Sequence, residues 1–403
     1  MYKNSNCNLC AGDLYHLKNF GKYPIVNQLL ERQVITEPPF FDFSLCVCSE
    51  CGLSQLENVI DQKLFYTNYA TPSSEKFNPH IKKLIARVKE FAKSDSRIIE
   101  IGCNDGTFLD KLIAEGYRNI FGLEPTHNTY KTAISKGHKV SNSFLTDQTI
   151  PELTEGGLFD LVITRQVLEH ISNLQDFGLA LNSLLNPDGY LIIEVPNANQ
   201  NLQNFDYSLW EEHVNYFTPL TLNTFLISCG FEIVVEWESI FAGECISIVA
   251  RKKNTKRKIN QNLAKNEIVK WIKWSNNFEN FKNTIHREIK SLSKGKELVL
   301  YGVGARSSVF VNFLDLSHIL AFAIDDSIFK QKKYMPYSKT KIISLEDLQT
   351  NVLDRYLILL GVNAENENRI IRDNLFIKQN SHISILPPSE NLPLAWKQFN
   401  LNN

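Results

Sequence analysis

The hydrophobic pattern of this chain changes repeatedly between short apolar runs and helical spacing. Three runs that each end at a polar loop are typical of buried strands: residues 98–101, 121–123 and 159–164. The segment after the first run, residues 108–113, is apolar at helical spacing. Strands that alternate with helices predict a doubly wound α/β sheet over residues 95–252. Two further runs predict a closing hairpin within residues 232–251.

The last part of the chain repeats the pattern. Residues 297–301 predict a strand, followed by a glycine turn and a helix, and we expect an α/β domain over residues 295–403. Residues 253–294 are expected to be a helical connector, because residues 268–292 are long and amphipathic. Its candidate packing positions are Ile268, Ile272, Phe278, Phe281, Ile285 and Ile289.

Cysteines are concentrated near the start of the chain. Two C-x-x-C pairs, Cys7 with Cys10 and Cys48 with Cys51, can supply four thiolates to one tetrahedral Zn²⁺. Cys46 is the spare thiol, since only Cys48 has the right spacing to Cys51. Four thiolates close the coordination sphere, so this metal should be structural and not catalytic. An iron–sulfur cluster or free buried thiols are the alternatives.

These cysteines define the first domain. We expect a zinc-binding domain over residues 1–60, followed by a linker and helix, residues 61–94, that cover the active site. The helix is predicted at residues 79–92, where apolar side chains fall on one face.

The first glycine turn follows the strand at residues 98–101 and reads Glu100-x-Gly102-x-x-x-Gly106. Asp105 makes this loop acidic, which disfavours a phosphate and suits the sulfonium, ammonium and ribose hydroxyls of S-adenosylmethionine. Glu124 ends the next strand and could accept from the ribose hydroxyls. The candidate donor-binding residues are Glu100, Gly102, Asn104, Asp105, Gly106, Glu124 and Gln166. The alternative is a glycine turn in an unrelated α/β domain.

Two histidines lie in loops at the same predicted sheet edge. His170 follows the fourth strand, and His213 follows Glu212 in the segment 210–218. Methylation of a carbon beside a carbonyl needs a base near neutral pKa and groups that stabilise the enolate. Histidine is the natural base, and a carboxylate such as Glu212 could tune or orient it. The alternative is that these residues only line the pocket or hold a loop.

Three motifs together resemble a known family. The cysteine pairs, the Glu100 loop and Glu212-His213-x-x-Tyr216-Phe217 are similar to those of zinc-containing nucleotide-sugar C-methyltransferases, the deoxysugar C-3 methyltransferase family. The resemblance implies a class I S-adenosylmethionine-dependent methyltransferase sheet, flanked by an N-terminal zinc-binding domain and a C-terminal Rossmann-like α/β domain. It also implies a nucleotide-linked 4-keto deoxysugar as substrate, with S-adenosylmethionine and structural Zn²⁺ as cofactors.

The resemblance also implies roles for single residues. In that family the histidine that matches His213 is the proposed base for the C-3 proton, and the residues that match Glu212 and His170 assist. This chain has Trp210 where the family has a tyrosine, and of two loop tyrosines it keeps only Tyr69. We expect Tyr69 and Trp210 to contact the sugar.

The second glycine turn has the opposite character from the first. Gly302 and Gly304 are followed by Arg306, so exposed amides, a helix N-terminus and a guanidinium would favour an anion such as a sugar nucleotide's pyrophosphate. A purely structural domain is one alternative, and a nicotinamide-binding domain, which would lack its third glycine, is another.

The composition and net charge of the chain indicate which classes of binding partner to expect. The chain has 403 residues, 43% hydrophobic and 22% charged, with a net charge of −1, which gives no reason to expect nucleic acid or an anionic membrane as a partner. No secretion signal or membrane-spanning run is recognised, so we expect a cytoplasmic enzyme that is a monomer or a weak homo-oligomer. An O- or N-methyltransferase acting on a sugar or small metabolite is the alternative enzyme, and a binding or scaffold protein is the alternative of another class.

Overall fold

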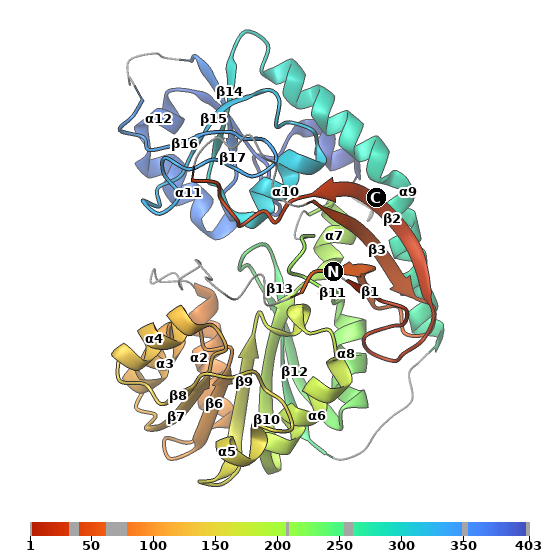
Figure 1. Cartoon of the computed structure of the whole chain (residues 1–403), viewed down its shortest axis with the longest axis vertical. Helices are drawn as coiled ribbons and strands as arrows, with labels where there is room; N and C mark the ends of the chain where they lie inside the picture. The colour runs from red at the N-terminus through yellow and green to blue at the C-terminus, as the bar shows by residue number, and fades with distance from the viewer. Residues whose placement is uncertain are drawn as a thin grey trace.

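The chain forms two lobes joined by N-terminal strands and a long helix. The structure, a computed structural model, describes residues 2–31, 40–61, 79–206, 209–253, 261–348 and 354–399. One lobe contains the largest sheet and the other a second parallel sheet (Figure 1). Helix α9 (Gln261–Leu292) runs beside the N-terminal strands to the second lobe (Figure 1).

Seven strands form the large sheet in the order β12-β13-β10-β9-β6-β7-β8. Strands β6 to β10 are parallel to one another, whereas β13 lies antiparallel between β10 and β12. The bounds are β6 (Arg97–Ile101), β7 (Asn119–Leu123), β8 (Val140–Ser141), β9 (Phe159–Arg165), β10 (Leu185–Pro196), β12 (Phe231–Ser239) and β13 (Cys245–Lys252). This is the class I strand order, so the predicted fold and its closing hairpin are confirmed.

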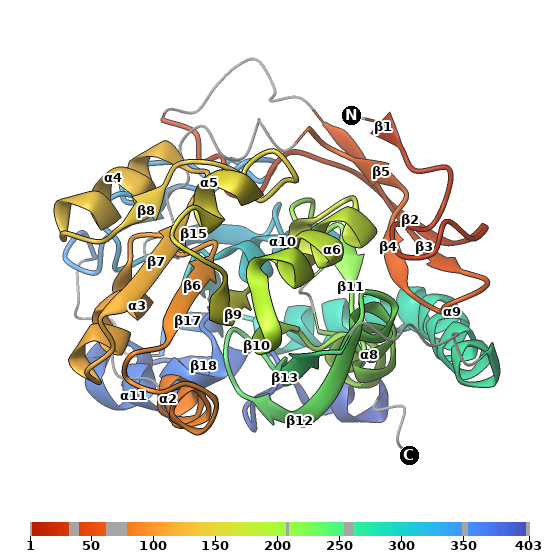
Figure 2. The same cartoon turned by 90° about the horizontal axis from the view of Figure 1, so that it is seen from below.

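Helices cover both faces of this sheet (Figure 2). Alternate residues of a strand point to opposite faces, and Ile98 and Ile163 accordingly belong to one apolar cluster, with Ile99 and Val162 in another. The first cluster includes side chains of α2 and α3, and the second includes side chains of α6 and α8. The helices are α2 (Pro79–Phe91), α3 (Thr107–Ala114), α4 (His127–Ser135), α5 (Ile150–Thr154), α6 (Leu174–Leu184), α7 (Ala198–Asn204) and α8 (Pro219–Ser228), with a 3₁₀ turn η1 (Leu168–His170).

The N-terminal sheet is not confined to the first 60 residues. It has the order β11-β4-β3-β2, and its edge strand β11 (Asn215–Tyr216) comes from the methyltransferase-like part of the chain. The other strands are β2 (Leu14–Tyr23), β3 (Phe41–Cys48) and β4 (Ser54–Leu56), and β1 (Tyr2–Lys3) pairs with β5 (Asn58–Val59). The cysteine-rich unit is therefore paired directly to the segment that contains His213.

The second lobe contains an all-parallel sheet in the order β16-β15-β14-β17-β18. The order 3-2-1-4-5 confirms the predicted Rossmann-like domain. Its strands are β14 (Glu297–Tyr301), β15 (Leu320–Ile324), β16 (Ile342–Ile343), β17 (Tyr356–Leu360) and β18 (Ser381–Ser384). Its helices are α10 (Ala305–Phe313), α11 (Ala364–Asp373), α12 (Leu375–Lys378) and the 3₁₀ turn η2 (Leu394–Phe399).

Helix α9 joins all three parts through one apolar cluster. Phe281 on α9 stacks on Phe205, which follows α7, with 4.6 Å between ring centroids. On the same helix, Phe278 lies edge-on to Phe20 of β2. Four of the six predicted packing positions are buried, but Ile268 and Ile272 are half-buried, and Trp271 and Trp274 occupy that part of the buried face.

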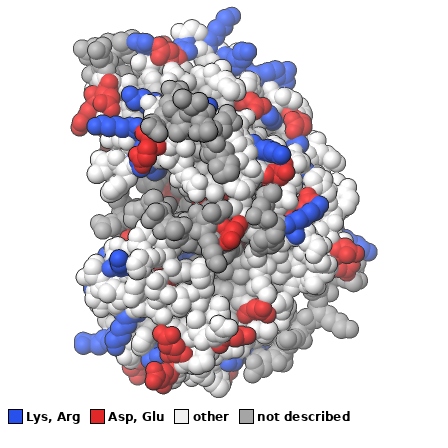
Figure 3. All heavy atoms as spheres, viewed as in Figure 1, with Lys and Arg blue, Asp and Glu red and all other residues white. Residues whose placement is uncertain are grey.

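Two properties of the described chain bear on its partners. In the part of the chain that the structure describes, no helix has both the length and the apolar character needed to cross a bilayer. On the face shown in Figure 3, acidic and basic side chains are interspersed over both lobes.

Candidate functional site

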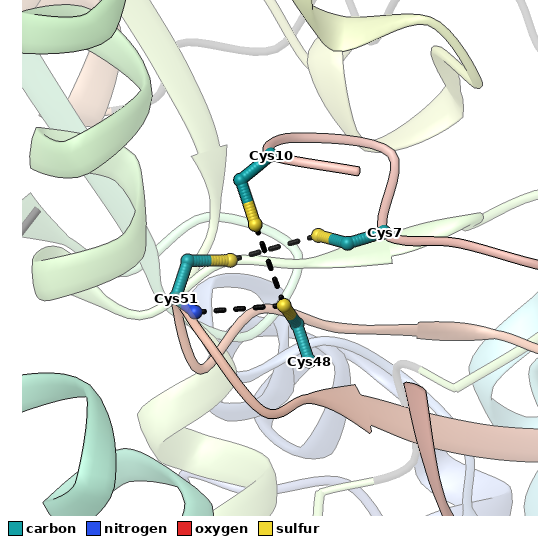
Figure 4. Close-up of side chains that lie close together, drawn as sticks. All are labelled: Cys7, Cys10, Cys48 and Cys51. Carbon is teal, nitrogen blue, oxygen red and sulfur yellow. Dashed lines mark hydrogen bonds between the residues drawn. The ribbon is translucent and has the colours of Figure 1, made fainter. Parts of the chain in front are cut away.

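The four predicted zinc ligands converge on one point. Figure 4 shows Cys7 and Cys10 on one loop facing Cys48 and Cys51 on another. The sulfur atoms lie within 4.8 Å of one another, with 3.6 Å between Cys7 and Cys51 and 3.4 Å between Cys10 and Cys48. A tetrahedral Zn²⁺ with bonds of about 2.3 Å separates its sulfurs by about 3.8 Å, so the cluster fits this ion.

The backbone around the cysteines supports thiolates. The amides of Leu9 and Glu50 point at the sulfurs of Cys7 and Cys48, both at 3.4 Å. Gly52, which follows the last ligand, has φ of 77°, a conformation that favours glycine. Cys46 lies outside the cluster: its thiol donates to the carbonyl of Gln55, and burial raises its pKa to about 12.

The predicted donor loop places an unpaired carboxylate oxygen inside the fold. Glu100 Oε1 accepts two hydrogen bonds from Arg165, at 2.8 and 3.1 Å, whereas the buried Oε2 has no partner among the described residues. Burial raises the pKa of Glu100; Arg165 opposes the shift, and the carboxylates of Glu124 and Asp105 add to it. Three neighbouring carboxylates with one free buried acceptor fit the ammonium and sulfonium of S-adenosylmethionine.

Glu124 holds the loop from the end of β7. Its Oε2 accepts from the amide of Asn104 at 2.9 Å, and its Oε1 accepts from Thr126 and Thr129. Asp105 caps the start of α3 through the amide of Thr107, at 3.1 Å. These contacts fix the loop and leave Glu124 Oε2 with room for a second donor, such as a ribose hydroxyl.

The backbone conformation of the donor loop explains why two of its positions are glycine. Gly102 and Gly106 have φ of 75° and 78°. A Cβ on Gly102 would lie 2.4 Å from Val167 Cγ2, so the segment after β9 packs directly against this glycine. Gln166, in that segment, also has a positive φ, and its backbone amide donates to the backbone carbonyl of Glu194 at 2.9 Å.

Replacing Glu124 with Gln should weaken donor binding. The substitution removes the charge and one acceptor that hold the loop and the ribose, and a hydrogen bond to a charged group contributes about 1.5–3 kcal/mol, which corresponds to an increase in Kd of about tenfold or more. Calorimetry with S-adenosylmethionine measures this. Glu155→Gln, at an exposed position next to α5, is the matched control; an unchanged Kd for Glu124→Gln would contradict the assignment.

His170 has a defined protonation state. Its Nδ1 lies 2.7 Å from the backbone carbonyl of Glu212, and since a carbonyl only accepts, Nδ1 carries the proton. Burial lowers the pKa of His170 to about 4, against the effect of this hydrogen bond, so the ring is neutral with Nε2 as an acceptor. Glu212 therefore orients His170 through its backbone carbonyl.

His213 lies between two rings. Its ring centroid is 3.8 Å from that of Trp210 and 5.0 Å from that of His170, which meets it edge-on. Trp210 Nε1 is buried and has no hydrogen-bond partner among the described residues, so this donor is available for a substrate oxygen. The structure thus brings together His170, Glu212, His213 and Trp210, whereas Tyr69 lies outside the described residues.

N-terminal residues hold the His213 loop. Asn27 Nδ2 donates to Glu212 Oε1 at 2.8 Å, and the amide of Val26 donates to Glu211 Oε1 at 2.7 Å. Burial raises the pKa of both carboxyls, that of Glu211 to about 8. Sequence reasoning missed Glu211 and Asn27, since no spacing connects residues so far apart in the chain.

Groups of the chain itself already accept hydrogen bonds from the backbone amides of the second glycine loop. The amides of Gly302, Val303 and Gly304 donate to the Ile324 carbonyl, Asp325 and Ser307. A Cβ on Gly302 would lie 2.8 Å from the Gly361 carbonyl oxygen, which gives this glycine a packing role. The acid that occupies the loop, Asp325, directly follows the next strand, β15.

Arg306 also differs from expectation. Its guanidinium is buried, pairs with Asp206, and donates to Asn363 at 2.9 Å and to the Pro387 carbonyl. A pyrophosphate could reach Arg306 only by displacing these partners. Anion binding at Gly302, Gly304 and Arg306 therefore stays a prediction that these contacts do not support.

The Arg306–Asp206 pair should contribute strongly to stability. Arg306→Met leaves Asp206, 2% exposed, without its cation, and removing one partner of a buried pair costs about 3–5 kcal/mol. Urea denaturation measures the change. Arg355→Met, which breaks a pair whose side chains are 47% and 42% exposed, is the control and should cost less than about 1 kcal/mol. Equal stability of the two variants would contradict this role.

Three family models match consecutive parts of the chain. A "Putative zinc binding domain" matches residues 7–66, a "Methyltransferase domain" matches residues 75–236, and a "C-methyltransferase C-terminal domain" matches residues 243–387. The chain therefore contains, in this order, a zinc-binding domain, a methyltransferase domain and a C-methyltransferase C-terminal domain. S-adenosylmethionine is the cofactor of the central domain, and the four cysteines form the zinc site.

Single relatives agree with this organisation. The C-methyltransferase NovU of Streptomyces niveus is 26% identical over 88% of this chain and 89% of its own length. The ubiquinone biosynthesis O-methyltransferase of Rickettsia canadensis is 31% identical over only 29% of this chain, which spans about half of that protein.

Solved structures give weaker likenesses. Magnesium protoporphyrin IX methyltransferase from Synechocystis PCC 6803 is 16% identical, with a TM-score of 0.33, over 43% of this chain and 78% of that one. The N-methyltransferase NodS from Bradyrhizobium japonicum is 17% identical, with a TM-score of 0.34, over 43% of this chain and 94% of that one. The fold assignment of the C-methyltransferase rests on its strand order.

Proposed function

We propose that this C-methyltransferase removes the proton beside the ketone of a nucleotide-linked keto-deoxysugar and then methylates that carbon. The observation that carries the proposal is the contact between two rings, the half-buried His170 and the buried His213, on loops next to the donor site. The segment after β9 connects the two sites: Arg165 pairs with Glu100 of the donor loop, and five residues on, His170 contacts the His213 loop.

The residues suit the two steps. His213 takes the proton of the C–H bond, whose electron pair moves toward the ketone oxygen to give an enolate. The bound donor supplies a methyl group on a positively charged sulfur, and the substrate carbon takes that methyl while the C–S electron pair stays on sulfur. Trp210 Nε1 has no hydrogen-bond partner among the described residues, and Trp210 stands where the family that the sequence resembles has a tyrosine, so it is our candidate to hold the oxygen that becomes negative.

Hydrogen bonds hold His170, Glu212 and the segment that contains His213 in place. His170 is held by the Glu212 carbonyl, Glu212 by Asn27, and the strand β11 begins two residues after His213. A base held on paired backbone loses little entropy when it reaches the substrate. The likeness to NovU along nearly the whole chain agrees with methylation of carbon.

An O-methyltransferase is the second candidate. The partial match to ubiquinone biosynthesis O-methyltransferases favours it, although that match covers only about three-tenths of this chain. Methylation of oxygen needs no loss of a C–H proton, so proton exchange separates the two functions.

The test follows that proton. The enzyme, with S-adenosylhomocysteine bound, is incubated in D₂O with 4-keto-6-deoxyglucose linked to thymidine, uridine, cytidine or guanosine diphosphate. We expect deuterium to appear at the carbon beside the ketone in at least one of these compounds, followed by a new methyl on that carbon when S-adenosylmethionine is added. Methylation of oxygen without exchange would establish the second candidate instead.

A further inference from the structure

Glu169 is a buried carboxyl group for which the proposed reaction has no role. The residue is 1% exposed, and neither carboxylate oxygen has a hydrogen-bond partner among the described residues. One oxygen lies 4.0 Å from His170 Nε2, and a carboxylate oxygen and a ring nitrogen from each of His170 and His213 lie within 4.8 Å of one another. An unpartnered carboxyl in the interior costs free energy, which a purely structural position would avoid by carrying an apolar residue.

The surroundings keep Glu169 protonated. Burial raises the pKa of Glu169 to about 8, against the effect of its own backbone amide, and the charge of Glu194 on β10 acts in the same direction as burial. The titratable groups that face it are His170 on its own turn η1, His213 on the loop before β11, and Glu194. At neutral pH Glu169 is thus mostly a carboxylic acid, which can donate from one oxygen while it accepts at the other.

We propose that Glu169 is a proton relay that carries the substrate-derived proton from His213 to His170 and so returns the base to its neutral form. This inference rests on the proposed function, because it assigns the fate of the proton that His213 removes. Glu169 acts through the histidines and, being fully buried, does not touch the substrate.

Glu169 has the same number of protons before and after the relay. His213 holds the proton from the substrate carbon, while the electron pair of the C–H bond remains on the enolate. His213 gives a proton to one oxygen of Glu169 as the other oxygen gives its own proton to His170 Nε2, so the carboxyl ends as it began. His170 is 14% exposed at its side chain and is a weak base in this site, so it releases the proton to water. The present separations are longer than hydrogen bonds, as in other ligand-free sites, and close by side-chain rotation or through one water.

Glu169→Gln tests the relay, because the amide has the size and neutral charge of the protonated carboxyl but cannot transfer a proton from His213 to His170. Wild type and variant are compared in the D₂O exchange with the four nucleotide-linked ketosugars, and in a single turnover with enzyme in excess over S-adenosylmethionine. In the variant the proton returns to the carbon it left, so we expect deuterium incorporation to fall at least about tenfold. The first methyl transfer should stay within about threefold of wild type, because proton removal itself is intact.

Glu169→Met is the second variant, in case Glu169→Gln does not fold. Its apolar side chain has a similar length and cannot pass a proton, so we expect the same division between exchange and first turnover. Wild-type exchange in a folded variant would overturn the relay, and so would an equal fall in exchange and methyl transfer. If wild type exchanges with none of the four ketosugars, the proposed function fails, and the relay fails with it.

Discussion

Replacing His213 with Asn should reduce turnover about a thousandfold and leave the Kd for S-adenosylmethionine nearly unchanged. General-base catalysis typically contributes 10²–10⁴-fold, and an amide in place of the His213 ring cannot take up the proton. The donor loop depends on Glu100, Glu124 and their own partners, none of which is His213. Steady-state kinetics and calorimetry on the same preparation measure both quantities.

His127→Asn is the matched control for this experiment. His127 is an exposed residue at the start of α4, so the same substitution there should change turnover by less than about twofold. If His213→Asn instead abolishes donor binding, His213 belongs to the donor site. If it leaves turnover intact, the base is another residue.

Loss of zinc should disable the enzyme even though the metal lies outside the reacting centre. Cys48→Ser removes one of four thiolates, and structural zinc sites in small domains contribute on the order of 10 kcal/mol to folding. Strand β4, which begins three residues after Cys51, pairs with β11, and Asn27 holds Glu212, so disorder in this unit reaches the His213 loop. We expect zinc content, thermal stability and turnover to fall together.

Cys46→Ser is the control that distinguishes the loss of zinc from the loss of a buried thiol. Cys46 is as buried as Cys48 and Cys51, but its thiol donates to a backbone carbonyl, and a serine hydroxyl can make the same hydrogen bond. That variant should keep one zinc per chain and most of its activity. A Cys48→Ser enzyme that loses zinc and still turns over normally would contradict the coupling between the zinc unit and the active site.

The fold was predictable because local pattern decides it. The predicted strands at residues 98–101, 121–123 and 159–164 are short, mainly apolar runs that coincide with β6, β7 and β9, and Gly102 and Gly106 mark the turn that follows the first of them. The zinc ligands were likewise visible from spacing alone, since two C-x-x-C pairs have few other uses in one short segment.

The contacts between distant segments were not predictable. Arg306 after a G-x-G turn is typical of an anion site, and nothing near it in sequence indicates that Asp206 would pair with it. Strand β11 has two residues, too short for any periodicity, although it places His213. Glu169 stands beside His170 in the sequence, but only its burial and missing partners distinguish it from an ordinary polar residue.

The most direct test of the account is the position of the transferred methyl group. The enzyme is given S-adenosylmethionine with a ¹³C-labelled methyl and the nucleotide-linked 4-keto-6-deoxyglucose that undergoes exchange, and the product is examined by carbon NMR. The account predicts a labelled methyl bonded to the carbon beside the ketone, with direct carbon–carbon coupling when the sugar is also labelled. A labelled methyl bonded to oxygen or nitrogen would contradict it.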